Sequence, residues 1–470
     1  MKRERDRERT MAALLAPDVI EILEHAPDQL AAETEEIHPA DLADIVEAVP
    51  ESAVAPLLLA LPRDRAADVL EYLDEELRTD LLETLSTREA AELVTAMTPD
   101  DRADALEDVD DETYEEILSE IPADARRETE QLIAYEPDTA GGLMTTDFVS
   151  VRTETRVEDA LARVRQLARS PKHEAMHAIY ATGPDDTLRG VLSLRELLAA
   201  PEGATVGDVA WSEVVSVPPT ADREEVARLT SDYDLVAIPV VDEERHVIGV
   251  VTVDDVIDAL EEEHTEDVQK FGGMEALDMP YTQIGFFQMI RKRAGWLAAL
   301  FLSEMLTASA MQHFSLELER AEVLALFIPL VMSSGGNSGS QATSLIIRAL
   351  ALGEVTVRDW WRVASRELPS GLALGAILGV IGFTRIMVWQ ELRLYDYGPH
   401  ATLLAFTVGL ALVGIVTFGS LVGAMLPFLL RRLGFDAASA SAPFVATLVD
   451  VTGLTIYFSV ALLVLHGTLL

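Results

Sequence analysis

The chain has 470 residues and carries 80 acidic against 36 basic side chains, a formal net charge of -44. This balance excludes a nucleic-acid-binding protein that works by neutralising phosphates, and the absence of cysteine excludes disulfides, thiolate metal sites and cysteine-based catalysis. Residues 271–470 hold 13 acids and 12 bases, so residues 1–270 carry nearly all of the net charge. We therefore predict an acidic soluble part joined to a membrane part.

A repeat with a step of 12 residues runs through the first 120 residues. Its tetrads are 43–46, 55–58, 67–70, 79–82, 91–94, 103–106 and 115–118. Pro50, Pro62 and Pro99 lie in the gaps between tetrads. Each unit suits a helix of two turns followed by a turn, with an apolar face that stacks on the next unit. We therefore predict an acidic α-helical superhelix as the first domain, over residues 1–140.

Two similar α/β modules follow, over residues 141–203 and 204–262. Each reads as a short strand, a helix, a strand, a turn, a strand and a helix, as in HAIYATGPDDTLRGVLSLRELL and LVAIPVVDEERHVIGVVTVDDVIDAL. The pair resembles tandem CBS domains, regulatory modules that often bind adenine nucleotides. The resemblance implies ATP or a related ligand near Arg195, Glu196 and Leu235. Leu235 stands where relatives stack an aromatic ring, and Glu196 stands where an aspartate often meets the ribose.

Residues His173 to His177 read HEAMH and match the zinc-protease signature HExxH, which needs both histidines on one helix face. His177 opens the predicted strand HAIYAT, so the two ligands would diverge, and the motif lies outside the predicted membrane spans. The phosphate-binding sequence GxxxxGK[ST] is absent. We therefore expect no protease, no ATP-driven pump and no other enzyme.

Five stretches reach the roughly 20 mostly apolar residues that a membrane-spanning helix needs. They are residues 296–314, 323–350, 371–389, 401–430 and 440–465. They form a predicted all-α membrane domain over 291–470, which a connecting helix over 263–290 precedes. Basic residues cluster before the first span and in alternate loops, so we expect a multi-pass cell-membrane protein with a cytoplasmic N-terminus and an extracellular C-terminus. The acidic, lysine-poor composition is typical of a salt-adapted prokaryote.

Ionisable side chains inside a span are costly in lipid and are functional candidates. Asp450 lies deep in the fifth span, and Glu304 lies midway along the first. The second span contains GGNSGSQ, whose glycines and Asn337 allow close helix packing or a break that exposes carbonyl groups. We expect Asp450, Asn337 and Glu304 to line a pore. A hydrogen bond of Asp450 to a neighbouring group and a seam of small residues are the structural alternatives.

Four stretches occur in a telling order: YEPDTAGGLMTTDFVSV, GVVTVDDVIDALEEEHTED, SSGGNSGSQATSLIIRALALGE and PFVATLVDVTGLTIYF. Through them the chain resembles the MgtE family of magnesium channels along nearly its full length. The resemblance implies a homodimer in a lipid bilayer, with one pore for hydrated Mg²⁺ between the subunits and Asp450 as the pore carboxylate. It also implies that cytoplasmic Mg²⁺ closes the pore by binding between the helical domain, the CBS modules and the connecting helix.

The family's regulatory metal sites match seven acids of this chain. These are Asp100, Asp104, Asp255, Asp258, Glu263, Glu266 and Asp267. Without Mg²⁺ the acidic half repels itself, and bound ions would let it compact and bring the connecting helix against the pore. Other readings are solvated acids of a salt-adapted surface, a channel for other divalent cations such as Co²⁺ or Mn²⁺, an ion-coupled transporter using Glu304, and a membrane-bound sensor without transport.

Overall fold

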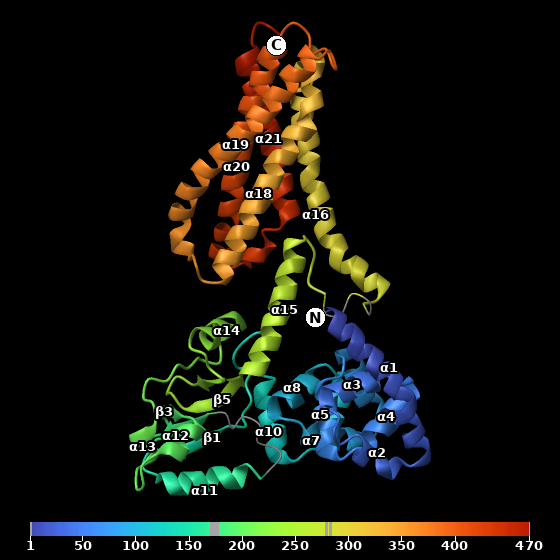
Figure 1. Ribbon diagram of the computed structural model, residues 1–470, viewed down its shortest axis with the longest axis vertical. Helices are drawn as coiled ribbons and strands as arrows, with labels where there is room; N and C mark the ends of the chain where they lie inside the picture. Colours follow the sequence, from blue (N-terminus) through green and yellow to red (C-terminus); the bar gives the residue numbers. More distant parts are fainter. Residues whose placement is uncertain (1, 170–177, 278–280, 282–283, 470) are drawn as a thin grey trace. The chain divides into compact units, whose positions relative to one another are not determined.

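The computed structural model describes residues 2–169, 178–277, 281 and 284–469. The HExxH motif at 173–177 lies outside the described residues. The chain divides into two compact units, Met1–Leu260 and Glu261–Leu470. In its described residues the first unit combines helices with two small sheets, whereas the second is helical (Figure 1).

The first unit opens with a stack of short helices. They are α1 (Lys2–His25), α2 (Pro27–Glu33), α3 (Pro39–Ala48), α4 (Glu51–Leu59), α5 (Arg63–Glu71), α6 (Glu75–Thr84), α7 (Thr87–Ala96), α8 (Pro99–Glu107), α9 (Asp111–Glu120) and α10 (Ala123–Leu132). Each predicted tetrad lies in one helix from α3 to α9, so the repeat is confirmed. Pro50 and Pro62 are the N-cap residues of α4 and α5, and Pro99 opens α8, where its missing N–H leaves no hydrogen bond unmade.

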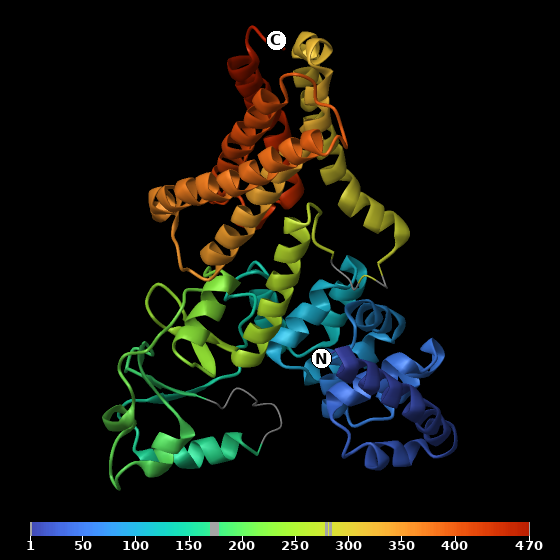
Figure 2. The ribbon, with the colours of Figure 1, turned by 45° about the horizontal axis from the view of Figure 1, so that its top comes forward.

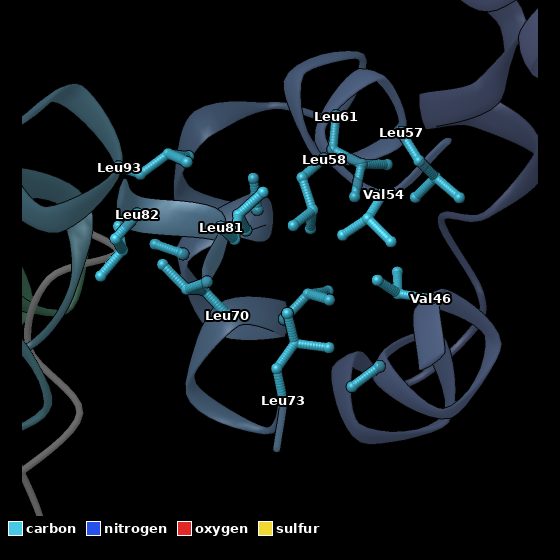
Figure 3. Close-up of a cluster of buried hydrophobic side chains, with 14 of the residues drawn as sticks. Val46, Val54, Leu57, Leu58, Leu61, Leu70, Leu73, Leu81, Leu82 and Leu93 are labelled. Atoms are coloured by element: carbon cyan, nitrogen blue, oxygen red, sulfur yellow. The ribbon is translucent and has the colours of Figure 1, made fainter. Parts of the chain in front are cut away.

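Alternate helices of this stack pack on one another: α3 on α5, α5 on α7 and α7 on α9. Their apolar faces form one core, in which Leu57, Leu70 and Leu82 are almost fully buried (Figure 3). Removing this apolar surface from water stabilises the stack by about 25 cal/mol per Å². Acidic side chains such as Asp41, Glu76 and Glu83 are exposed on the outer faces.

The first CBS module contains β1 (Val149–Arg152), α11 (Val157–Leu167), β2 (Ile179–Thr182), β3 (Leu188–Leu192) and α12 (Leu194–Ala199). Helix α13 (Val206–Val209) follows the boundary between the modules, and Val206 packs into the apolar core of the first one. Strand β2 pairs parallel to β1 and antiparallel to β3. The second module contains α14 (Arg223–Asp232) and the antiparallel strands β4 (Ala237–Val241) and β5 (Val247–Thr252). Its predicted first strand is reduced to one bridge between Val217 and Val240. Pro218 and Pro219 follow this bridge, and because proline has no N–H the ladder stops there.

The helix after β5 differs from the prediction. Helix α15 (Val253–Phe271) is continuous through the predicted boundary between the second module and the connecting helix. It ends before Gly273, whose φ of +76° is a left-handed conformation that terminates helices. The segment predicted as a connecting helix over 263–290 therefore contains the end of α15 and the start of α16 (Phe286–His313), and its described residues from 272 to 285 are not helical.

The second unit contains five long helices in its described part. They are α16 (Phe286–His313), α18 (Ile328–Ala351), α19 (Trp360–Glu391), α20 (Ala401–Arg432) and α21 (Ala442–Leu465), with the short elements α17 (Ser315–Arg320), η1 (Glu322–Phe327), η2 (Val357–Asp359) and η3 (Ala437–Ser439) between them. Helices α16 and α19 begin well before the predicted starts at 296 and 371, because the charged segments that precede the two apolar stretches, residues 291–293 and 362–367, are also helical.

Four helical segments of the described chain are long and apolar enough to cross a membrane: Phe286–His313, Val357–Glu391, Ala401–Arg432 and Ala442–Leu465. Helix α18, the second predicted span, is not among them. Its central Ser, Gly, Asn and Gln residues lower its hydropathy, and it packs against both α20 and α21. Helix α20 lies alongside α18 and α19, as both views show (Figures 1 and 2).

Glycines bring the backbones of α18 and α20 into direct contact. A Cβ atom added to Gly419 would lie 2.4 Å from the Gly335 carbonyl oxygen, and one added to Gly423 would lie 2.2 Å from that of Gly339. Thr343 Oγ1 donates to the Gly423 carbonyl at 2.8 Å across the same seam. The predicted small-residue packing seam is therefore present, and close backbone approach holds it together.

Replacing Gly423 by Ala is expected to destabilise the second unit by about 1–3 kcal/mol, the usual cost of inserting a methyl group into a packed core. The atoms nearest to the added Cβ all belong to the Gly339 backbone, so no side chain can rotate away to make room for it. Gly336→Ala is the matched control, because its added Cβ would meet Ala446 at an ordinary 3.4 Å. The measurement is thermal unfolding of the full chain in detergent. Equal melting temperatures for the two variants would contradict this account.

Candidate functional site

Three groups of acidic side chains lie where the sequence placed candidate metal ligands. The first group is on α8 and at the start of α15. Asp100 lies in the first turn of α8 and Asp104 one turn later, so the two share a face. Asp255 lies in the first turn of α15, where its carboxylate accepts a hydrogen bond from the Thr252 backbone N–H at 3.3 Å and another from the Thr252 hydroxyl.

The hydrophobic core of the second CBS module brings these two helices together. Ala103 of α8 is buried in the same apolar cluster as Val251 of β5 and Val256 of α15. The acids on either side of these apolar residues therefore meet at the edge of the cluster. Asp100 Oδ1 is buried and, within the described part of the chain, has no hydrogen-bond partner, which is costly for a carboxylate oxygen unless a cation compensates it.

The pKa values of these carboxyl groups reflect their crowding. Burial raises the pKa of Asp100, and hydrogen bonds from Thr98 and Thr145 offset part of that rise. Burial also raises the pKa of Asp255, and the charge of Asp100 raises it further. Desolvation and the charges of Asp100 and Asp101 raise the pKa of Asp104 to about 7, although its side chain is at the rim of the group.

A divalent cation with a preference for oxygen ligands fits this group. Mg²⁺ and Ca²⁺ bind carboxylate oxygens and water, and Mg²⁺ keeps several of its waters. Asp100, Asp104 and Asp255 would hold such an ion, and its charge would remove the repulsion among them. The structure brings these three predicted residues together. Asp258 lies one turn beyond Asp255 on α15 and is exposed, as Asp104 is.

The second group is at the C-terminal end of α15, within the second unit. Glu263, Glu266 and Asp267 are half-buried there. Desolvation and the charge of Asp436 raise the pKa of Asp267 to about 6. Lys270 Nζ lies 2.8 Å from Asp436 Oδ2 and also pairs with Glu266.

Asp436 is a member of this group that the sequence reading missed. It is the N-cap residue of η3, and its side chain accepts a hydrogen bond from the Ala438 N–H at 2.8 Å. Phe271, at the end of α15, packs on Ala438 and Ala440. The sequence does show Asp436 as an acid in the short loop between two apolar helices, α20 and α21. It contains no pattern that indicates that this loop contacts α15.

The third group lies among the long helices. Asp450 of α21 is half-buried, and Glu304 of α16 is close enough for the two charges to interact. Helix α16 packs on α21, which explains this proximity. Asn337 of α18 points to the outside of the helix bundle, and its Nδ2 donates to Ser333 Oγ of the same helix at 3.4 Å. The described contacts pair Asp450 with Glu304 and not with Asn337.

The predicted nucleotide residues do not form one open pocket. Glu196 Oε2 accepts a hydrogen bond from the Ser193 backbone N–H at 2.7 Å, and Glu196 Oε1 accepts one from the indole N–H of Trp211. Arg195 is exposed, and Leu235 packs against the core of the second module. Both carboxylate oxygens of Glu196 are thus engaged by other residues of the chain, Ser193 and Trp211.

Comparisons with known proteins agree with this organisation. The chain matches the profile described as MgtE intracellular N domain over residues 37–138, CBS domain over 140–203 and 206–262, and the MgtE divalent cation transporter domain over 328–460. The magnesium transporter MgtE of Thermus thermophilus is 45% identical over 342 residues, which are 73% of each chain. The chain belongs to the MgtE family.

Two solved structures resemble this MgtE-family chain over about half of its length. The soluble part of a magnesium transporter is 28% identical with a TM-score of 0.51, covering 54% of this chain and 99% of that one. The cytosolic domain of the Mg²⁺ channel MgtE in complex with ATP is 37% identical with a TM-score of 0.49, covering 52% of this chain and 99% of that one. The family models and the Thermus thermophilus relative confirm the recognition of the family from sequence.

Proposed function

We propose that this MgtE-family protein is a channel that admits Mg²⁺ into the cell and that cytoplasmic Mg²⁺ closes. The observation that carries the proposal is the group formed by Asp100, Asp104 and Asp255. Burial and neighbouring carboxylates raise the pKa values of Asp104 and Asp255 there, and Asp100 Oδ1 is buried without a hydrogen-bond partner among the described residues. A sensor of this kind serves a protein that moves the same ion. Asp450 supplies a candidate transport residue in the apolar helices of the same chain.

The transport path in this proposal runs among five membrane-crossing helices, with α18 as the polar one. Mg²⁺ dehydrates reluctantly, so a carboxylate that contacts its water shell suits it better than a tight cage. Asp450 would provide that contact, and Glu304 would add charge near it. Entry needs no pump, because two positive charges gain about 4.6 kcal/mol per 100 mV of inside-negative potential. The protein then transports an ion and catalyses no reaction.

We further propose a homodimer with the first unit in the cytoplasm and the C-terminus outside the cell. One face of α15 supports the dimer: Ile257, Leu260 and Val268 recur at helical spacing and are all exposed. An exposed apolar stripe of this kind is typical of an interface between protein chains. The orientation follows from the basic residues that flank the cytoplasmic ends of the spans, such as Arg291 and Arg431.

Regulation in this proposal acts through charge. Mg²⁺ at Asp100, Asp104 and Asp255 would draw the helical stack and the second CBS module together. Further Mg²⁺ would bind Glu263, Glu266, Asp267 and Asp436 at the other end of α15. An adenine nucleotide at the CBS modules would have to displace the Trp211 indole from Glu196 before its ribose could bind there.

The test is Mg²⁺ flux into proteoliposomes under an inside-negative potential, with Mg²⁺ set independently on each side. We expect fast flux that falls as Mg²⁺ rises on the sensor side. Co²⁺ and Mn²⁺ in the same assay distinguish a selective channel from a broader one, and flux that requires a Na⁺ or H⁺ gradient would indicate coupled transport. Vesicles without flux at any Mg²⁺ concentration would overturn the channel and leave a sensor.

A further inference from the structure

The two CBS modules meet at the tips of their β-hairpins. One tip joins β2 to β3 and carries Asp185 to Thr187, and the other joins β4 to β5 and carries Asp242 to His246. The Leu188 backbone N–H donates to the Arg245 carbonyl at 2.8 Å, and Thr187 forms an antiparallel bridge with His246. His246 is therefore placed directly at the junction of the modules.

Both ring nitrogens of His246 face hydrogen-bond acceptors. Nδ1 lies 2.9 Å from Asp242 Oδ2, and Nε2 lies 3.1 Å from the backbone carbonyl oxygen of Asp185 in the other module. A neutral imidazole has one N–H and can satisfy one of these acceptors, whereas the protonated ring donates to both. The geometry thus fits the imidazolium form.

The charged groups around the ring favour the same form. On its own hairpin the ring faces Asp242 and Glu244, with Arg245 beside it. From the first module come Asp185 and Asp186, whose carboxylates are paired with Arg189 at 3.4 Å and Arg152 at 3.6 Å. The hydrogen bond to Asp242 outweighs desolvation and raises the pKa of His246, with further contributions from the Asp185 carbonyl and Glu244. The side chain is 40% exposed, so protons exchange freely with solvent.

We propose that His246 is a proton-operated clamp between the two CBS modules. When the ring is protonated, it ties the β4–β5 tip to the β2–β3 tip through Asp242 and Asp185. When the ring loses its proton, one of the two bonds is lost and the junction loosens. The stabilisation is fully present below the ordinary histidine pKa of about 6.5 and is lost as the pH rises through the higher pKa of the folded protein.

The clamp also bears on the proposed magnesium sensor, and this part rests on the proposed function. Strand β5 begins directly after His246 and ends at Thr252. The backbone N–H and the hydroxyl of Thr252 donate hydrogen bonds to the Asp255 carboxylate. A closed clamp orders this strand and keeps Asp255 beside Asp100. Protonation of His246 should therefore favour closure of the channel by Mg²⁺.

The direct test is NMR titration of histidine-labelled full-length protein in detergent and chelator, without Mg²⁺. The chain has nine histidines, and His246→Gln assigns the resonance of interest. We expect His246 to titrate above the ordinary value of about 6.5, and Asp242→Asn to move its titration down toward that value. Titration of wild-type His246 at or below the ordinary value would overturn the clamp. This result does not depend on transport.

The functional test compares wild type with His246→Gln in the flux assay, at one pH below and one above the measured titration. Protons also compete with Mg²⁺ at Asp104 and Asp255, so the informative quantity is the difference between the two proteins. At the lower pH we expect the variant to need about fivefold more Mg²⁺ for half-closure, at the low end of typical allosteric couplings. At the higher pH the two should agree. Equal Mg²⁺ dependence at both pH values would overturn the link to the sensor.

Discussion

Replacing Asp255 by Asn is expected to raise the Mg²⁺ concentration that half-closes the channel by about tenfold, which corresponds to ~1.4 kcal/mol of lost binding free energy. The change removes one carboxylate from the group that contains Asp100 and Asp104. It also removes a like charge from beside buried Asp100, so the Mg²⁺-free protein should become more stable. Flux and thermal unfolding at varied Mg²⁺ measure the two effects together.

The pH dependence of stability gives a second signature of the same group. The pKa of Asp104, at about 7, and the pKa of Asp255 are raised in the folded protein. A carboxyl group with a raised pKa favours the folded state while it is protonated, so the Mg²⁺-free protein should lose stability as the pH rises from about 4, the unfolded value. Saturating Mg²⁺ should suppress that loss, and Mg²⁺ binding should release protons.

Asp159→Asn is the matched control for Asp255→Asn. It makes the same change of charge in the same unit, but Asp159 is exposed on α11. We expect the control to keep the Mg²⁺ dependence of wild type. If the two variants shift the half-closing concentration equally, net charge and not the Asp100–Asp255 group governs the response.

Replacing Asp450 by Asn should reduce Mg²⁺ flux at least tenfold at every Mg²⁺ concentration. The substitution keeps the size of the side chain and removes the charge that draws a divalent cation into the apolar helices. Sensing should be unaffected, because the acids of the first unit are unchanged. Flux measures the first expectation, and Mg²⁺-dependent thermal stabilisation measures the second.

Two further variants are measured in the same flux assay: Glu391→Gln as the matched control for loss of charge, and Glu304→Gln as the test of the acid near Asp450. Glu391 lies exposed at the end of α19, so its loss of charge should leave flux unchanged. Glu304 is near Asp450, and we expect its replacement to lower flux less than Asp450→Asn does. Unchanged flux in Asp450→Asn would move the pore carboxylate to Glu304 and refute the assignment of Asp450.

The local elements of this fold were largely predictable. The step of 12 residues placed each tetrad in its own helix from α3 to α9, since a short amphipathic helix is encoded by nearby residues. The predicted ends of two elements were wrong, because in each case one or two residues terminate the strand or helix. Pro218 and Pro219 ended the first strand of the second module, and Gly273 ended α15 earlier than its polar continuation suggested.

The candidate site divides in the same way. Sequence identified Asp100, Asp255 and Asp450 as candidates, because carboxylates in these motifs match the family. It missed Asp436, which is far along the chain from Lys270 but lies 2.8 Å from it. It also gave no reason to single out His246, since the Asp185 carbonyl that faces its ring comes from the other module.

The sequence by itself determined the division into an acidic part and an apolar part, the helical repeat and the family, because composition, periodicity and motifs are properties of contiguous residues. The tertiary structure decided which acids lose their water and meet one another. Burial of Ala103 with Val256 sets Asp100 beside Asp255, and the glycine contacts of α18 with α20 keep a polar helix inside the bundle. Desolvation and proximity depend on packing between distant segments, and they single out Asp100 and Asp255 as the carboxylates proposed to bind a cation.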